Sequence, residues 1–394
     1  MGGLQNALPP RGWLLSERAA CRALATAWLE TGTSTRPSSG LPAGAHPIGE
    51  FFEEVRVFII GIDPHKASHT VAVLDGHEQL VGEIRVRADR SQRDRLLRFA
   101  ARFEPRCWAI EGATGTGALL AQQLVATGET VLDVPPKLSA RVRVLDTERS
   151  DKTDAHDARS AAVVALRHSR LRVVAVEDHS TLLRLFAKRH HDLVAHRTRA
   201  ICRLHAVLCQ LVAGGLPKHL AATRAATELR HIRPVDAISI QRRRIALELL
   251  SEVRRADTDL AELKTRITAA VSASATTVTN VIGVGPVIAA YLIGYSGEIT
   301  RFPTAGHYGR YNGTAPIEAS SGPNPRHRLN PRGNRQLNHA LHIAAVTQVR
   351  NDTPGRAYYL RKQAEGKTRK EAMRALKRRI SDAVYRQLRA DATR

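Results

Sequence analysis

Four acidic residues stand where their carboxylates could share metal ions. Asp63 and Glu111 each end a short apolar run, and Asp154 and Asp157 are three residues apart in an Ala-rich segment. A spacing of three places two side chains on one face of a helix. Hard divalent cations prefer carboxylate oxygens, and two Mg²⁺ ions about 3.5–4 Å apart can activate a nucleophile and stabilise a leaving oxygen. We therefore predict that these four acids bind two Mg²⁺ ions, which Mn²⁺ can replace, although one such acid alone is more often a helix cap or a solvated residue.

The elements that must carry these acids form the pattern of an α/β domain. Apolar and amphipathic periodicity predicts strands at 57–62, 70–74 and 81–86, a helix at 91–103, a strand at 107–110, a helix at 117–127, a strand at 130–134 and a helix from 154. This order is that of a ribonuclease H-like (RuvC-like) domain with a mixed sheet. Asp63 and Glu111 then lie at strand ends, where a carboxylate projects from the sheet edge.

Composition divides the chain into four segments. Residues 1–52 are rich in Pro, Ser, Thr and Gly, and we expect a disordered extension or a start codon placed too far upstream. Residues 53–176 contain the α/β domain. Apolar spacing over 177–272, broken at 214–217, predicts two helices that form a coiled-coil hairpin or pair with another subunit. A helical linker packed on its own domain is the alternative. Residues 273–394 are predicted to be a mainly α domain.

The charge balance favours a polyanionic partner. The chain has 60 Lys and Arg against 37 Asp and Glu, a net charge of +23, and residues 361–389 alone hold eleven basic against three acidic residues. Such an excess favours nucleic acid, although ribosomal and membrane-surface proteins share it. The four cysteines lack zinc or CxxC spacing, and no apolar run approaches the length of a membrane span. We therefore expect a cytoplasmic protein with reduced thiols, associated with the nucleoid when bound to DNA.

Several motifs are candidates for contact with nucleic acid. His65 and Lys66 directly follow the first strand and could contact phosphate or hold Asp63 in place. The turn at 282–286 has the pattern of a helix-hairpin-helix, in which Gly283 and Gly285 let backbone amides approach a phosphate; a simple helix–helix turn is the alternative. The remaining candidates are Arg332, Asn334, Arg335, Lys377 and Arg378.

Two other features are interpreted as structural. The Gly-rich residues 111–117 lack the Lys-Ser/Thr of a P-loop and have glycines spaced G-x-x-G-x-G, which argues for a tight turn exposing Glu111 and against nucleotide binding. His156 lies between the paired acids in sequence, and helical geometry predicts that it points to another face.

Together these segments resemble the DEDD-type transposases of bridge-RNA insertion sequences, whose relatives include the pilin-gene invertases. The matching residues are 61–66, 110–112, 152–158, 283–286 and the Ser-Gly and Arg-Gly-Asn block, within 56–390. The Lys-Thr-Asp-x-x-Asp-Ala element at 152–158 is the most specific. It favours Asp154 with Asp157 over the alternative pair formed with Asp151. Residues 1–52 depart from the family, in which the first strand lies near the start.

The resemblance implies a RuvC-like catalytic domain joined by a coiled coil to a transposase domain with a nucleophilic serine. The DEDD set becomes Asp63, Glu111, Asp154 and Asp157, and the serine before glycine becomes Ser321, with Ser320 adjacent. The family implies a covalent phosphoserine, a site composed of acids from one subunit and serine from another in a dimer or tetramer, and a structured noncoding RNA that selects DNA by base pairing.

Two other functions stay open at this point. A structure-specific nuclease of the Holliday-junction-resolvase kind would use the same acids to activate water and leave Ser321 idle. A catalytically inactive nucleic-acid-binding protein is the second alternative, against which the complete acid set argues.

Overall fold

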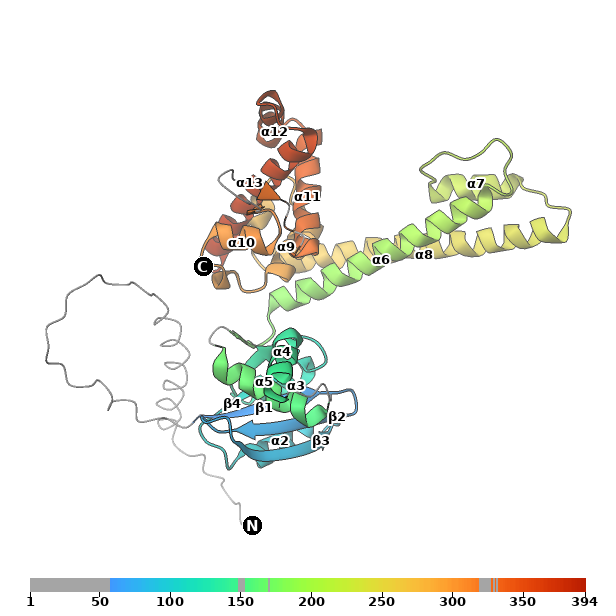
Figure 1. Cartoon of the computed structure of the whole chain (residues 1–394). Coiled ribbons are helices and arrows are strands. Elements are labelled where there is room, and N and C mark those ends of the chain that lie inside the picture. Colours follow the sequence, from blue (N-terminus) through green and yellow to red (C-terminus); the bar gives the residue numbers. More distant parts are fainter. Residues whose placement is uncertain (1–56, 148–152, 169–170, 319–326, 329, 331) are drawn as a thin grey trace, which may run out of the picture. The chain divides into compact units, whose positions relative to one another are not determined.

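The structure, a computed structural model, describes residues 57–147, 153–168, 171–318, 327–328, 330 and 332–394 (Figure 1). It divides into two compact units, the first ending at Val176 and the second beginning at Glu177. The further division of the second unit at residue 273 stays a prediction.

The first unit contains a six-stranded mixed sheet of order β3-β2-β1-β4-β5-β6. Strand β1 pairs antiparallel with β2 and parallel with β4; β5 is parallel to β4, whereas β3 and β6 pair antiparallel with their neighbours. The mixed sheet predicted from the element order is therefore confirmed. The strands are β1 (Phe58–Pro64), β2 (Ser68–Leu74), β3 (Leu80–Arg87), β4 (Arg106–Glu111), β5 (Val131–Val134) and β6 (Arg172–Val173).

Helices cover both faces of this sheet. Helices α2 (Gln92–Ala100) and α3 (Ala118–Ala126) pack on the face that bears Ile60 and Ile62. Helix α5 (Asp154–Arg167) packs on the opposite face, because side chains alternate along each strand. Burial on both sides explains why β1 is a continuous apolar run. Helix α4 (Pro136–Thr147) and strand β6 were not among the predicted elements.

Helix α5 crosses β1 directly over Gly61. A Cβ at this position would lie 2.1 Å from the carbonyl oxygen of Ala158 and 2.8 Å from the backbone nitrogen of Ala162. Glycine is therefore the residue that permits this backbone-to-backbone approach. Asp63 lies two residues further along β1 and faces the same side of the sheet, which brings it under the first turn of α5.

The second unit begins with a pair of long helices, α6 (His179–Leu208) and α8 (Ala237–Ala273) (Figure 1). They run antiparallel, since Arg197 pairs with Asp257 and, nearer the start of α6, Leu183 packs in one core with Val271. The predicted break is confirmed: Gly214 has a positive φ of 87° in the connection between the helices. A short helix in that connection, α7 (Ala222–His231), was not predicted. The supercoil of a coiled coil stays a prediction.

The remainder of the second unit is mainly α-helical, as predicted. Its core combines apolar residues of several helices, for example Leu292, Leu341 and Ile380, with residues of the long pair such as Leu183 and Val271. A two-stranded ribbon, β7 (Ile317–Glu318) with β8 (His327–Arg328), is added to it. The helices are α9 (Pro286–Ser296), α10 (Ala305–Tyr311), α11 (Arg335–Arg350), α12 (Pro354–Ala364) and α13 (Arg369–Asp391), with 3-10 turns η1 (Val278–Asn280) and η2 (Ile299–Arg301).

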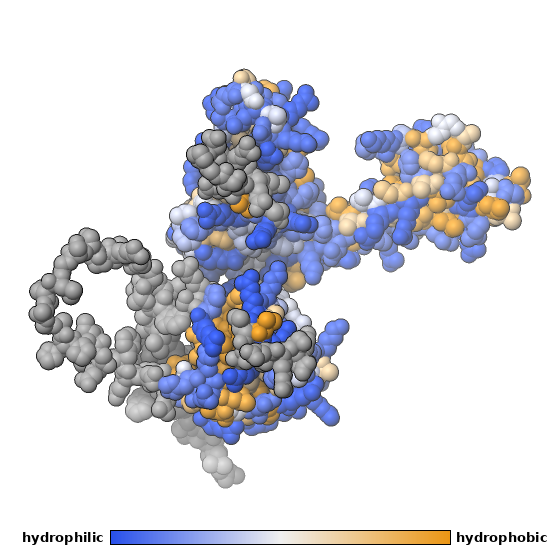
Figure 2. All heavy atoms as spheres, viewed as in Figure 1, coloured by the Kyte–Doolittle hydropathy of each residue, from blue (hydrophilic) through white to orange (hydrophobic). Residues whose placement is uncertain are grey.

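Most of the described surface visible in Figure 2 is hydrophilic. Hydrophobic residues gather at the α7 end of the helical pair, where Val235 and Ile238 are exposed. Among the described helices, none combines the length and the hydropathy needed to cross a membrane.

Candidate active site

The paired strands bring two of the predicted acids to one edge of the sheet. Ile62 of β1 lies opposite Ile110 of the parallel strand β4, so Asp63 and Glu111 follow side by side. Because Ile62 and Ile110 point into the α2–α3 core, the two acids point to the α5 face. Both strand ends therefore deliver a carboxylate beneath the same helix.

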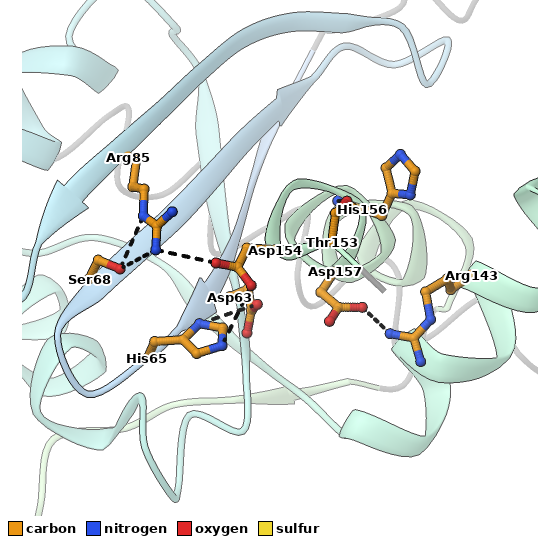
Figure 3. A network of polar contacts seen from close by, with 9 residues as sticks. All are labelled: Asp63, His65, Ser68, Arg85, Arg143, Thr153, Asp154, His156 and Asp157. Carbon is orange, nitrogen blue, oxygen red and sulfur yellow. Dashed lines mark hydrogen bonds and ion pairs between the residues drawn. The ribbon is translucent and has the colours of Figure 1, made fainter. Parts of the chain in front are cut away.

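The start of α5 supplies the other two acids. Thr153 caps the helix by accepting a hydrogen bond from the backbone N–H of His156, which places Asp154 and Asp157 in the first turn. Negative charge in a first turn is favoured by the helix dipole. His156 itself points away from the acids, as predicted (Figure 3).

The ring of His65 lies between Asp63 and Asp154 (Figure 3). Its Nδ1 is 3.4 Å from Asp63 Oδ2, and its Nε2 is 3.7 Å from Asp154 Oδ1. One ligand atom from each of the three residues lies within 4.8 Å of the other two, a spacing that suits a single metal ion. The sequence indicated His65 only as a phosphate contact or a support for Asp63, whereas the structure makes it a candidate ligand.

Glu111 is partly buried beside these residues. Its Oε2 is buried and has no hydrogen-bond partner among the described residues. Burial raises the pKa of the Glu111 carboxyl above its ordinary value; the nearby Ser139 hydroxyl, outside hydrogen-bonding geometry, partly opposes this shift, and the charges of Asp63 and Asp157 add to it. A carboxylate buried in this way is stabilised by a cation. The described donor set, carboxylates with one imidazole, therefore fits a divalent metal ion.

Two arginines pair with the acids of α5 (Figure 3). Arg143, from α4, forms a close ion pair with the buried Asp157. Arg85, from β3, has its Nη2 3.4 Å from Asp154 Oδ2 and also donates to Ser68 Oγ. Sequence reasoning missed both arginines. The alternation of Arg85 with Ile84 and Val86 was a usable signal, because it places Arg85 on the face opposite the α2–α3 core.

An open groove of about 600 Å³ adjoins the acids. His65 and Arg85 belong both to this groove and to the acid cluster, so the two are continuous. Lys66, predicted to contact nucleic acid, is exposed in it. The residues that line the groove are Pro64, His65, Lys66, Ala67, Ser68, Arg85 and Thr116.

The two glycines predicted to contact phosphate in the second unit, Gly283 and Gly285, differ from each other in their surroundings. Gly283 has a φ of 83°, and a Cβ there would lie 2.7 Å from the carbonyl oxygen of Ala344, so this glycine serves close packing on α11. Gly285 caps α9, is exposed and has open space around its Cβ position. A one-turn 3-10 helix, η1, precedes the turn, and a full helix-hairpin-helix stays a prediction.

The Arg-Gly-Asn block lies at the start of α11. Asn334 caps this helix by accepting hydrogen bonds from the backbone N–H groups of Gln336 and Leu337. The flanking residues Arg332 and Arg335 are exposed. The arginines are thus available to a ligand, whereas the Asn334 side chain is engaged in the cap.

The two candidates on α13 are partly buried. Lys377 Nζ donates a hydrogen bond of 2.5 Å to Asn338 Oδ1, and burial lowers the pKa of Lys377 to about 8. Arg378 Nη2 is 3.0 Å from Asp382 Oδ1. Arg378 also packs against Gly309, where an added Cβ would collide with the guanidinium of Arg378. The serines Ser320 and Ser321, and the alternative acid Asp151, lie outside the described residues.

Two family models match the chain. One, named for the DEDD transposases of IS110 and described as a transposase, matches residues 60–213. The other, described as transposase of the IS116/IS110/IS902 family, matches residues 275–360. The first match contains all four predicted acids, and the second contains Ser321.

Proteins of insertion elements are similar over most of this chain. The 44.8 kDa protein of insertion element IS116 from Streptomyces clavuligerus is 27% identical over 376 residues, 84% of this chain and 94% of that protein. The 42 kDa protein of IS900 from Mycobacterium paratuberculosis is 26% identical over 382 residues, 84% of this chain and 96% of that protein. Among solved structures, Thermus thermophilus RuvC in complex with a Holliday junction substrate is 16% identical and covers 30% of this chain and 99% of its own, with a TM-score of 0.25.

Proposed function

The chain belongs to the IS110 family of DEDD transposases, and on that premise we propose that it cuts and rejoins DNA with a metal-binding acid site and a serine nucleophile. The observation that carries the proposal is the convergence of Asp63, His65 and Asp154, with ligand atoms within 4.8 Å of one another. Beside them lies a buried oxygen of Glu111 that has no hydrogen-bond donor among the described residues. A structured noncoding RNA is the proposed guide, and a dimer or tetramer in the cytoplasm the proposed active form.

Divalent ions held by Asp63, Glu111, Asp154 and Asp157 would neutralise charge on the DNA phosphate. The protein's own part in this unit is to hold these carboxylates close together. The first turn of α5 supports the negative charge of its two aspartates, and Arg143 keeps Asp157 from being an uncompensated buried charge. Lys66, exposed in the adjoining groove, is proposed to bind the DNA backbone.

Ser321 is the proposed nucleophile of the second unit. Its hydroxyl loses its proton as the oxygen bonds to phosphorus, and the deoxyribose oxygen departs as a hydroxyl, so that the strand is held as a phosphoserine. The hydroxyl of a partner strand then displaces the serine oxygen from phosphorus. Gly285, Arg332, Arg335 and Lys377 are proposed to bind nucleic-acid backbone. Arg378 and Gly283 have packing partners of their own, and their contribution to binding would be indirect.

A covalent-adduct assay tests this function. The full chain, with Mg²⁺, the RNA transcribed from the DNA flanking its gene and the cognate DNA sites, is expected to form a protein–DNA adduct that survives denaturation. Ser321→Ala should abolish the adduct, and Ser320→Ala should retain it. Asp154→Asn should abolish it while folding and RNA binding persist, with Asp151→Asn as the matched control.

Two outcomes would replace the proposal. DNA cleavage without an adduct, unchanged in Ser321→Ala, would identify a resolvase-like nuclease in which the acids activate water. Binding of RNA and DNA without cleavage under any condition would identify an inactive nucleic-acid-binding protein.

A further inference from the structure

Arg85 belongs to two sites at once. Its guanidinium contacts Asp154 in the acid cluster, with 3.4 Å between Nη2 and Oδ2, and it lines the groove that holds Lys66. Its Nε and Nη2 also donate to Ser68 Oγ at 3.2 Å and 3.1 Å. The arginine therefore stands at the boundary between the predicted metal ligands and the surface where a nucleic-acid backbone would pass.

The contact between Arg85 and Asp154 is a weak one. The two side chains are 66% and 39% exposed, and the pair meets through a single long contact. Exposed pairs of this kind shift an equilibrium by at most about five-fold. The Arg143–Asp157 pair differs in being mostly buried, at 21% and 7% exposure. Of these two arginines, Arg85 is the one that can change partner at little cost.

The other oxygen of Asp154 faces the acid cluster. Its Oδ1 lies 3.7 Å from His65 Nε2, and Asp154 is one of the three residues whose ligand atoms suit a metal ion. A divalent cation bound there would neutralise Asp154 and weaken its attraction for Arg85. The same event would leave the guanidinium, already in the groove, available to another anion.

We propose that Arg85 binds a phosphodiester of the DNA strand at the acid site, and that metal binding releases it from Asp154 for this purpose. The inference rests on the proposed function of the acids. A guanidinium presents five donors in a planar fork that matches a phosphate in a bidentate manner. None of the seven described residues that line the groove is Phe, Tyr or Trp, so the groove suits a backbone better than a stacked base.

Metal affinity provides the first test. Because Arg85 competes with the cation for Asp154, Arg85→Gln in the full chain is expected to bind Ca²⁺ up to about five-fold more tightly in titration calorimetry. Arg87→Gln is the matched control: Arg87 is an exposed arginine on the same face of β3, two residues further along, and does not line the groove. Its Ca²⁺ affinity should equal that of the unaltered protein.

DNA binding provides the second test, with a fluorescent DNA duplex in Ca²⁺ or in EDTA. In Ca²⁺, Arg85→Gln should weaken binding about ten-fold and reduce the slope of log K against log salt by about 0.9, the value for one phosphate contact. In EDTA, the DNA affinity of Arg85→Gln should differ from that of the unaltered protein no more than the affinity of Arg87→Gln does. Arg85→Lys, which keeps the charge without the fork, should recover part of the loss.

Two results would be decisive against the role of Arg85. Equal effects of Arg85→Gln and Arg87→Gln in both conditions would overturn it, and so would a loss confined to an RNA hairpin used in place of the duplex. If the unaltered protein binds no Ca²⁺, or Asp63→Asn binds it equally well, the metal site itself fails, and that outcome is distinguishable from failure of Arg85 alone.

Discussion

Glu111 and Asp157 are neighbours in the acid cluster, but their charges are compensated to different extents. Asp157 is buried against Arg143, whereas Glu111 has a buried oxygen without a hydrogen-bond partner among the described residues and is repelled by Asp63 and Asp157. Removing each charge should therefore have different effects on the stability of the metal-free protein.

We predict that Glu111→Gln leaves the metal-free protein equally stable or more stable, by up to about 1 kcal/mol, because a poorly solvated charge is removed. Asp157→Asn should cost about 1–3 kcal/mol, because Arg143 loses the opposing charge. Both variants should lose the rise in Tm that Mg²⁺ produces in the unaltered protein. Urea unfolding and thermal melts with and without Mg²⁺ measure these effects; a full Mg²⁺ response in Glu111→Gln would remove this residue from the metal site.

A second prediction at the residue scale concerns Lys377, which makes the stability of the folded protein depend on pH. Its pKa is lowered by burial to about 8 from an ordinary 10.5, so the unfolded chain holds the proton more tightly than the folded protein between these values. Stability therefore rises with pH across this window, while below about pH 8 the cost of the buried charge is fully present. His342, whose own pKa is lowered by burial and by Lys377, adds to the positive surroundings.

The measurement is the urea midpoint from pH 7.5 to 10.5. In the Lys377→Met protein, we expect the urea midpoint to lack the part of its rise with pH that Lys377 contributes. Lys370 is an exposed lysine in the first turn of the same helix, and the Lys370→Met protein should retain the full rise. If Lys377 binds DNA as proposed, affinity in the unaltered protein should also weaken as the pH passes 8. Identical pH profiles for the two variants would contradict the assignment.

At the scale of elements, the contact of α5 with β1 determines where the acids meet. The helix can lie against the strand because Gly61 has no side chain, and its first turn then reaches the edge that holds Asp63. Asp63 and Asp154 are 91 residues apart in the sequence. The packing of α5 on β1 is therefore what brings the two halves of the acid set together.

Gly61→Ala should therefore damage both the fold and the site. The added methyl group would collide with the backbone of α5, and backbone cannot move aside as a flexible side chain can, so we expect a cost of about 3 kcal/mol or more and a loss of Mg²⁺ response. Gly76→Ala is the control, because nothing lies within 4 Å of a Cβ at that exposed turn. Equal stability of the two variants would mean that α5 tolerates displacement.

At the scale of the whole molecule, the proposed active form is an oligomer in which one subunit supplies the acids and another the serine. Mixing therefore gives a direct test: Asp154→Asn and Ser321→Ala proteins, each inactive alone, should together form the covalent DNA adduct when subunits exchange. If the two variants assemble at random, the mixture should form about a quarter to half as much adduct as the unaltered protein. A mixture that exchanges subunits and remains inactive would indicate that each chain provides its own complete site.

Much of the first unit was predictable because the signals that specify it are local. A strand with both faces buried is a run of apolar residues, a helix packed on a sheet repeats its apolar positions every three to four residues, and Thr153 caps α5 beside its acids. Local patterns were weaker for α4, which begins at the second of two consecutive prolines and mixes basic with apolar residues. They were also weaker for α7, which lies in a connection predicted as a break.

The sequence by itself indicated the groups on which the proposed chemistry depends: four carboxylates on the ends of strands and the start of a helix, and an excess of positive charge suited to nucleic acid. The tertiary structure decided which charges meet. His65 stands between Asp63 and Asp154, Arg143 reaches Asp157 from the unpredicted helix α4, and Arg85 reaches Asp154 from the edge strand β3. The physical reason is that periodicity specifies the face on which a side chain lies, whereas its partner across that face depends on how separate elements pack.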